Sequence, residues 1–312
     1  MSIVSHVQAD DGAFVVGGQA TNLWAWFYRD KIPRQREEQI FTSIDVDYFG
    51  EAGVARMLAD ALGGNVRRPS QDAMNTPSTA VVEIEIGGRS VSIDFLNKIL
   101  GIKNREFAKG VSELKFPAES EGRVGEVMIP VMHPVLCLKS RIANIMHPAT
   151  RRQDATALDQ ARAAHHVMIA YIDHAINDGA HRETAACFQG LFTYLRRDEF
   201  GRRAHLETPV DPLGILRAFA DDPRIDERYR QKNLAIQITE IETFRAGLEE
   251  RIAPDRERAR GRKGSRGQAI LDELKDKYGS ITAAIAKTKA NAASESVTSD
   301  ATQKTKGTGI AD

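Results

Sequence analysis

The sequence predicts an α+β protein, with a mixed sheet and flanking helices in the first half and an all-helical part after it. Two observations support this class. Short apolar or alternating runs typical of strands are interleaved with helical periodicity up to about residue 133. Beyond that point apolar residues recur almost only at helical spacing. The predicted divisions are 1–133 for the mixed domain, 134–289 for the helical domain and 290–312 for a tail too poor in apolar residues to fold.

Composition favours a globular protein of the cytoplasm. The chain has 312 residues, of which 42% are hydrophobic, which is enough for one large or two ordinary domains. The start, "MSIVSHVQADDG", lacks a basic segment followed by an apolar one, and no run of about 18 apolar residues occurs, so we expect no contact with a membrane. Cys137 and Cys187 lack metal-type spacing and are interpreted as packing residues in a reducing compartment.

The first element is predicted in "VVGGQATNLWAWFY", which begins at Val15. A short buried strand at 13–16 is followed by Gly17, Gly18 and then a pattern of helical spacing. Glycines between a strand and a helix let a polyanion approach backbone N–H groups at the positive end of the helix. A phosphate site and a simple tight turn both fit this stretch.

The second strand is predicted in "FTSIDVDYFG", where apolar and acidic residues alternate. Because successive side chains of a strand point to opposite faces, Asp45 and Asp47 share one face and Val46 and Tyr48 the other. The sequence therefore predicts two carboxylates on one face of a strand.

A hairpin is predicted in "VVEIEIGGRSVSIDFL", because two alternating runs flank a glycine pair that accepts positive φ at both turn positions. A two-residue loop at Gly87 and Gly88 fixes the register. The expected pairs are Ile86 with Arg89, Ile84 with Val91, and Val82 with Ile93. The apolar pairs define the core face, so that Glu83, Ser92 and Asp94 point to the opposite face.

Three carboxylates on neighbouring strands, Asp45, Asp47 and Asp94, repel one another unless a cation neutralises them. Mg²⁺ prefers such hard oxygen ligands and takes further ligands from water and substrate phosphates. The alternative is three solvated acids on an open sheet face. The spacing of the acids leaves both interpretations open.

These motifs, in the order "GG", "SIDVD" and "IDF", resemble the nucleotidyltransferase fold of the polymerase-β superfamily. "VVGGQATNLW" with "TSIDVDYF" is similar to its abortive-infection type branch, which includes toxins of toxin–antitoxin pairs, and the likeness covers roughly residues 13 to 160. It implies a polymerase-β-like domain in which the acids hold two Mg²⁺ ions and the glycine turn holds nucleotide phosphates. The implied metal ligands are Asp45, Asp47 and Asp94, and the implied nucleotide-binding residues are Gly17, Gly18, Gln19 and Ser43.

The branch also has a lysine on a helix after the sheet and, further on, an acid in an Arg-Asp context. "HPVLCLKSRIANI" supplies Lys139, and "RRQDATALDQ" supplies Asp154. The resemblance implies that Lys139 contacts triphosphate oxygens and that Asp154 positions it or assists at the metal. Pro134 suits the first turn of the helix. An exposed lysine without a catalytic role is the alternative.

Two departures from the branch bear on substrate and loop geometry. Many members carry an arginine where this chain has Phe41, and the interval from Gly18 to Asp45 is longer than in compact members. The implied activity is transfer of a nucleoside monophosphate from a triphosphate to a hydroxyl of RNA, protein or a small molecule, with a cognate antitoxin as a partner. The alternative is a catalytically silent nucleotide-binding or regulatory module on the same fold.

A basic stretch, "PDRERARGRKGSRG", follows the helical half. The 43 basic and 43 acidic residues of the chain cancel, so any affinity for RNA depends on a local patch of this kind. An RNA contact through Arg256–Arg266 and a solvated hinge are the two interpretations. The basic residues concerned are Arg256, Arg258, Arg260, Arg262, Lys263 and Arg266.

Overall fold

The computed structural model describes residues 12–33, 46–69, 76–86, 88–107, 110–120, 123–148, 154–254 and 258. The chain up to Phe244 forms one compact unit, and a second unit begins at Arg245. The expected boundary between residues 133 and 134 falls where the last strand ends and a helix begins; as a domain border it stays a prediction. Several predictions concern residues outside the described ones: Phe41, Ser43, Asp45, the tail 290–312 and, apart from Arg258, the basic residues of the stretch 256–266.

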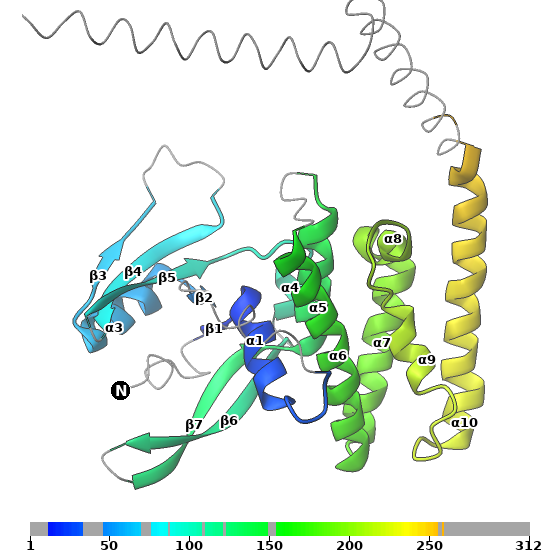
Figure 1. The fold of residues 1–312 in the computed structure, drawn as a ribbon, viewed down its shortest axis with the longest axis horizontal. Helices are drawn as coiled ribbons and strands as arrows, with labels where there is room; N and C mark the ends of the chain where they lie inside the picture. Colours follow the sequence, from blue (N-terminus) through cyan, green and yellow to red (C-terminus); the bar gives the residue numbers. More distant parts are fainter. Residues whose placement is uncertain are drawn as a thin grey trace, which may run out of the picture. The chain divides into compact units, whose positions relative to one another are not determined.

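The first unit is α+β, as predicted, and contains a seven-stranded mixed sheet with flanking helices (Figure 1). The strand order is β3-β4-β5-β2-β1-β7-β6. β1 pairs antiparallel to β2 and parallel to β7, and β2 pairs parallel to β5. The strands are β1 (Phe14–Val15), β2 (Val46–Phe49), β3 (Asn65–Arg67), β4 (Ser78–Ile86), β5 (Arg89–Leu96), β6 (Val111–Ser120) and β7 (Arg123–Met132).

The predicted hairpin is confirmed with its register. β4 and β5 pair Ile86 with Arg89, Ile84 with Val91, and Val82 with Ile93. Gly88 has φ +75°, the left-handed conformation expected at this turn. The core face is as expected, because Val82, Ile84 and Ile93 are buried.

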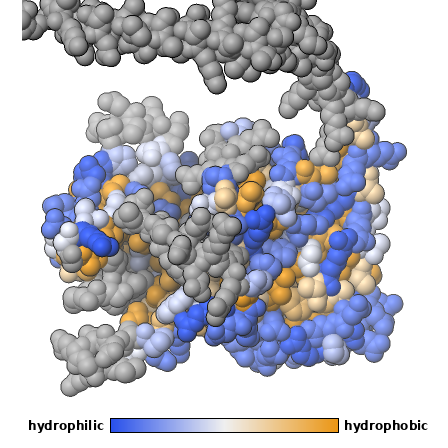
Figure 2. Space-filling model, viewed as in Figure 1, coloured by the Kyte–Doolittle hydropathy of each residue, from blue (hydrophilic) through white to orange (hydrophobic). Residues whose placement is uncertain are grey.

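Helices flank the sheet, and in Figure 1 most of them lie on the side away from β3–β5. No helix in the described part of the chain is long and apolar enough to cross a membrane. Figure 2 shows hydrophilic residues over much of the helical part, with hydrophobic ones between them. The helices are α1 (Gly17–Phe27), α3 (Ala52–Leu62), α4 (Asn104–Phe107), α5 (Pro134–Met146), α6 (Ala155–Asn177), α7 (His181–Arg197), α8 (Glu199–Glu207), α9 (Leu213–Ala218) and α10 (Glu227–Tyr229), followed by a π-helical turn (Arg230–Leu234). The chain is also helical over 235–254.

α5 joins the sheet to the helices. Pro134 occupies its first turn, as predicted, and the preceding His133 caps the helix by accepting a hydrogen bond from Val135 N–H at 3.2 Å. The helix buries Cys137 in the core of the sheet and Leu138 in a second core formed with α6 and α7. α1 packs against α5 and α6. α1, α5 and α6 therefore pack together against the sheet, beside the point where β1 leads into α1.

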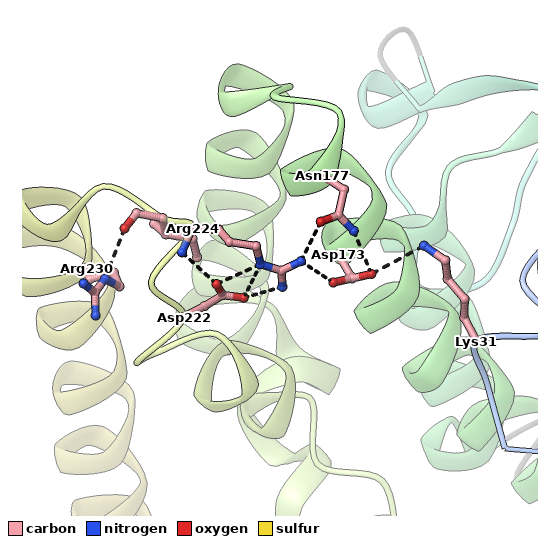
Figure 3. A network of polar contacts seen from close by, with 7 residues as sticks. Lys31, Asp173, Asn177, Asp222, Arg224 and Arg230 are labelled. Atoms are coloured by element: carbon pink, nitrogen blue, oxygen red, sulfur yellow. Dashed lines mark hydrogen bonds and ion pairs between the residues drawn. The ribbon is translucent and has the colours of Figure 1, made fainter.

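A polar network ties the end of α6 to the segments around it (Figure 3). Arg224 donates to Asp173 at 2.9 Å and to Asn177 at 2.7 Å, and it pairs with Asp222 at 2.5 Å. Lys31, which follows α1, pairs with the same Asp173 at 3.4 Å. The network thus connects the chain after α1, the end of α6 and the loop before α10.

Candidate functional site

The acidic pair lies on adjacent parallel strands. Asp47 of β2 and Asp94 of β5 are register partners. Their neighbours Tyr48 and Phe95 are fully buried on the opposite face, with ring centroids 5.5 Å apart. Because side chains alternate along a strand, this burial turns both carboxylates toward the other face, where each is half-buried. The expectation that these two acids share one sheet face is confirmed.

The glycine turn lies directly against Asp47. Gly17 has φ +67°, and a Cβ at this position would overlap Oδ2 of Asp47. The backbone adds a further link, since Val16 N–H donates to the Asp47 carbonyl at 2.8 Å. Glycine at position 17 therefore suits the left-handed backbone, and any side chain there would displace the Asp47 carboxylate. The structure brings together Gly17, Asp47 and Asp94, which are three of the predicted site residues.

Gly18, the next residue after Gly17, faces Gln160 and the buried Arg141. A Cβ at Gly18 would lie 3.1 Å from Gln160 Nε2 and 3.7 Å from Arg141 Nη1. Arg141 Nη1 donates to Gln160 Oε1 at 2.9 Å, so α5 and α6 meet at the glycine turn. The sequence interpretation missed Arg141 and Gln160. The available signal was a second cation two positions after Lys139, inside a helix of mostly apolar residues.

Gln19, the third residue of the predicted phosphate turn, is half-buried on α1. It lines a cavity of about 260 Å³ together with Asn22, Leu23 and Trp26, which follow it along the helix. Gln19, which lines this cavity, directly follows Gly18 in the chain. Space for part of a small ligand therefore exists beside the glycine turn.

Lys139 has a different environment from the one expected. Its ammonium pairs with Glu106 of α4 at 2.5 Å and lies 5.5 Å from the centre of the Tyr194 ring. Burial would raise the pKa of the Glu106 carboxyl, but hydrogen bonds from Lys139 and the Lys103 backbone, with both lysine charges, outweigh it and lower the pKa. The Lys139 side chain is only 6% exposed, so the alternative of an exposed helix lysine is wrong. Its contact with triphosphate stays a prediction.

Asp154 is the residue that caps α6. Its Oδ1 accepts a hydrogen bond from Ala157 N–H at 2.9 Å, which satisfies a free donor of the first helical turn. The acceptor that the structure gives to Lys139 is Glu106, not Asp154. A role of Asp154 at the metal or toward Lys139 stays a prediction.

A second polar cluster surrounds Glu183 of α7 and lines a cavity of about 410 Å³. Glu183 Oε1 lies 3.1 Å from His133 Nε2, 3.1 Å from the Tyr171 hydroxyl and 3.5 Å from the Cys187 thiol. The hydrogen bond from His133 is the largest cause that lowers the pKa of Glu183 to about 2, against the desolvation that raises it.

His133, Glu183 and Cys187 are close enough to hold a metal ion. However, His133 Nδ1 already accepts a hydrogen bond from Val135 N–H. A neutral imidazole with Nδ1 as acceptor carries its proton on Nε2, which then donates to Glu183 instead of binding a metal. Hydrogen bonds to Glu183 therefore account for this cluster.

The donor set at Asp47 and Asp94 suits a hard divalent cation better. Both groups are carboxylates on rigid strands, with the glycine turn beside them where a phosphate would add further oxygen ligands. These are ligands that Mg²⁺ prefers. The residues present fit Mg²⁺, and Asp45 stays a predicted third ligand.

No protein-family model, curated protein or solved structure matches the chain.

Proposed function

We propose that this protein is a Mg²⁺-dependent nucleotidyltransferase of the polymerase-β type, similar to the abortive-infection branch of that superfamily. The observation that carries the proposal is the register pairing of Asp47 with Asp94, with Gly17 packed against Asp47. An acidic pair beside a glycine turn at a helix start provides places for a cation and for a polyphosphate.

In this proposal Asp47 and Asp94, with Asp45, hold Mg²⁺, which would neutralise charge on the reacting phosphate and on the leaving pyrophosphate. The glycine turn binds phosphate oxygens through backbone N–H groups at the start of α1. Asp94 accepts the proton of the acceptor hydroxyl as that oxygen attacks the α-phosphate. The protein mainly positions the reactants and compensates their charge, as in other phosphoryl-transfer enzymes.

The acceptor is a hydroxyl of RNA, of a protein or of a small molecule. RNA binding through Arg256–Arg266 and a cognate antitoxin remain parts of the proposal that rest on the resemblance and on composition. The experiment is incubation of the purified protein with each α-³²P-labelled triphosphate, Mg²⁺ and total cell extract. We expect one class of macromolecule or metabolite to acquire label with the parent protein and none to do so with Asp47→Asn.

A second candidate function is that of a module that binds nucleotide without catalysing its transfer. The ion pair of Lys139 with Glu106 favours it, because the lysine expected to stabilise the leaving pyrophosphate is occupied by a carboxylate. This module would bind Mg²⁺-triphosphate without transferring label to any acceptor. Binding and label transfer, measured on the same preparation, separate the two candidates.

A further inference from the structure

Arg141 lies in a position that the proposed reaction leaves without a role. Its side chain extends from α5 to Gly18, and the residue is only 9% exposed. Its guanidinium donates to Gln160 Oε1 at 2.9 Å and to Ser140 Oγ at 3.4 Å. A guanidinium has five N–H donors in a planar fork that matches phosphate oxygens. Arg141 therefore presents a fixed positive charge to the glycine turn.

The two glycines of the turn face groups of opposite charge. Gly17 touches the carboxylate of Asp47, whereas Gly18 faces Arg141 and Gln160. A triphosphate bound across the two glycines has its reacting phosphate on the acidic side, where a cation compensates the charge. Its terminal phosphates then extend toward the guanidinium. A positive charge at this end stabilises both the bound triphosphate and the pyrophosphate that leaves.

We propose that Arg141, held by Gln160, is the residue that binds the terminal phosphates of the nucleotide at the Gly17–Gly18 turn. This inference rests on the proposed function. Gln160 is a positioning residue: its Oε1 accepts from Arg141, and its Nε2 faces Gly18. Lys139, two residues before Arg141 on α5, gives its ammonium to Glu106 instead.

The sharpest test is Gln160→Glu, because this change keeps the size and the acceptor of the side chain and places a negative charge beside Arg141. Gln189→Glu on α7 is the matched control, because it is the same substitution at an exposed position outside the site. Arg141→Gln removes the charge, and Arg141→Lys keeps it without the fork. Circular dichroism verifies the fold of each variant, and Gln160→Glu alone decides if Arg141→Gln fails to fold.

The measurement is calorimetric binding, in Mg²⁺, of the mono-, di- and triphosphates of each of the four common ribonucleosides. We expect the parent and Gln189→Glu to bind triphosphates more tightly than monophosphates. Gln160→Glu and Arg141→Gln should lose about tenfold to a hundredfold in triphosphate affinity, with little change for monophosphates. Arg141→Lys should fall between them.

Two results overturn the assignment of Arg141 while leaving the proposed function in place. One is parent-like triphosphate affinity in Gln160→Glu. The other is an equal loss for mono- and triphosphates, which indicates a structural effect on the whole site. If the parent itself binds no nucleotide, the proposed function fails, and the role of Arg141 fails with it.

Discussion

Asp47 and Asp94 are register partners on the parallel strands β2 and β5, and both lie on the sheet face opposite the stacked rings of Tyr48 and Phe95. Register partners on adjacent parallel strands place their side chains next to each other on one face of the sheet. A divalent cation bound at this face could take ligands from both strands, which the first variant tests.

Asp47→Asn should abolish metal-dependent transfer of nucleotide and leave the fold intact. The amide keeps the shape of the side chain but removes the charge that a hard cation requires. Asp60→Asn, on the exposed side of α3, is the control and should retain activity. Label transfer and thermal melting are measured on each variant. Full activity in Asp47→Asn would show that the acid pair does not hold the catalytic metal.

Gly17→Ala should be far more costly than Gly63→Ala. Both glycines have nearly the same conformation, with φ +67° and φ +66°, but a Cβ at position 63 meets open space and one at position 17 overlaps Asp47. We expect Gly63→Ala to cost about 1 kcal/mol of unfolding free energy from backbone strain alone. Gly17→Ala should cost about 3 kcal/mol because overlap is added to strain.

Urea denaturation of both variants measures this difference, and calorimetry with Mg²⁺-triphosphate measures the effect on the site. Only Gly17→Ala should weaken nucleotide binding. Equal losses of stability in the two variants would mean that the glycine turn is not packed against Asp47 as described.

Glu183 should make the stability of the protein depend on acid pH. Hydrogen bonds from His133 and Tyr171 help to hold the pKa of Glu183 at about 2 in the folded protein, below its ordinary value of 4.5. As the pH falls, the Glu183 carboxyl is therefore protonated in the unfolded chain at a higher pH than in the folded protein. The stabilisation is complete above about pH 5 and is lost as the pH falls toward about 2.

The melting temperature is measured from about pH 6 to about pH 2 at constant ionic strength, a range that covers the titration of Glu183 in both states. In Glu183→Gln the curve should be flatter over the acid part of this range than in the parent. Glu199→Gln, an exposed residue at the start of α8, is the control and should follow the parent. A parent-like slope in Glu183→Gln would contradict the hydrogen-bonded role of the carboxylate.

Arg224 should stabilise the helical part more than an exposed arginine elsewhere. It joins Asp222, Asp173 and Asn177 in one network, so its removal breaks several contacts together. We expect Arg224→Ala to lower the unfolding free energy by about 1 kcal/mol, with a smaller difference at high salt because the charges are screened. Arg182→Ala on α7 is the control. An equal loss of unfolding free energy in both variants would show that the network of Arg224 adds no stability.

Lys139 and Glu106 should be coupled in stability. The ammonium is nearly buried, so removing either partner leaves a charge without its ion pair. A double-mutant cycle with Lys139→Met and Glu106→Gln should give a coupling of about 1–2 kcal/mol in unfolding free energy. A parallel cycle with Asp154→Ala, measured on label transfer, tests the predicted partnership of Lys139 and Asp154. Additive losses of transfer rate in that cycle would exclude the partnership.

The face on which each of the two acids lies could be predicted from the sequence because its causes are local. Alternation fixed the face of Asp47 along its own strand, and the turn at Gly88 fixed the register that places Asp94. A two-residue turn leaves a hairpin one register, so the face of Asp94 followed without knowledge of any distant contact.

The cationic side could not be predicted in the same way. Helical spacing places Lys139 and Arg141 on different faces of α5, but it does not say which face meets the glycine turn. Glu106, which pairs with Lys139, lies on the four-residue helix α4, 33 positions earlier in the chain. Asp154 did carry a local signal, because an acid immediately before a helix is a common cap.

In the proposed function, Asp47, Asp94 and the Gly17–Gly18 turn form a site for a divalent cation and a nucleoside triphosphate. Electron paramagnetic resonance of Mn²⁺, used in place of Mg²⁺, measures this directly through the fraction of free ion with and without triphosphate. We predict that the parent protein binds Mn²⁺, that triphosphate tightens this binding, and that Asp47→Asn loses both effects while Asp60→Asn keeps them. Equal Mn²⁺ binding by the parent and Asp47→Asn, with or without triphosphate, would contradict the claim.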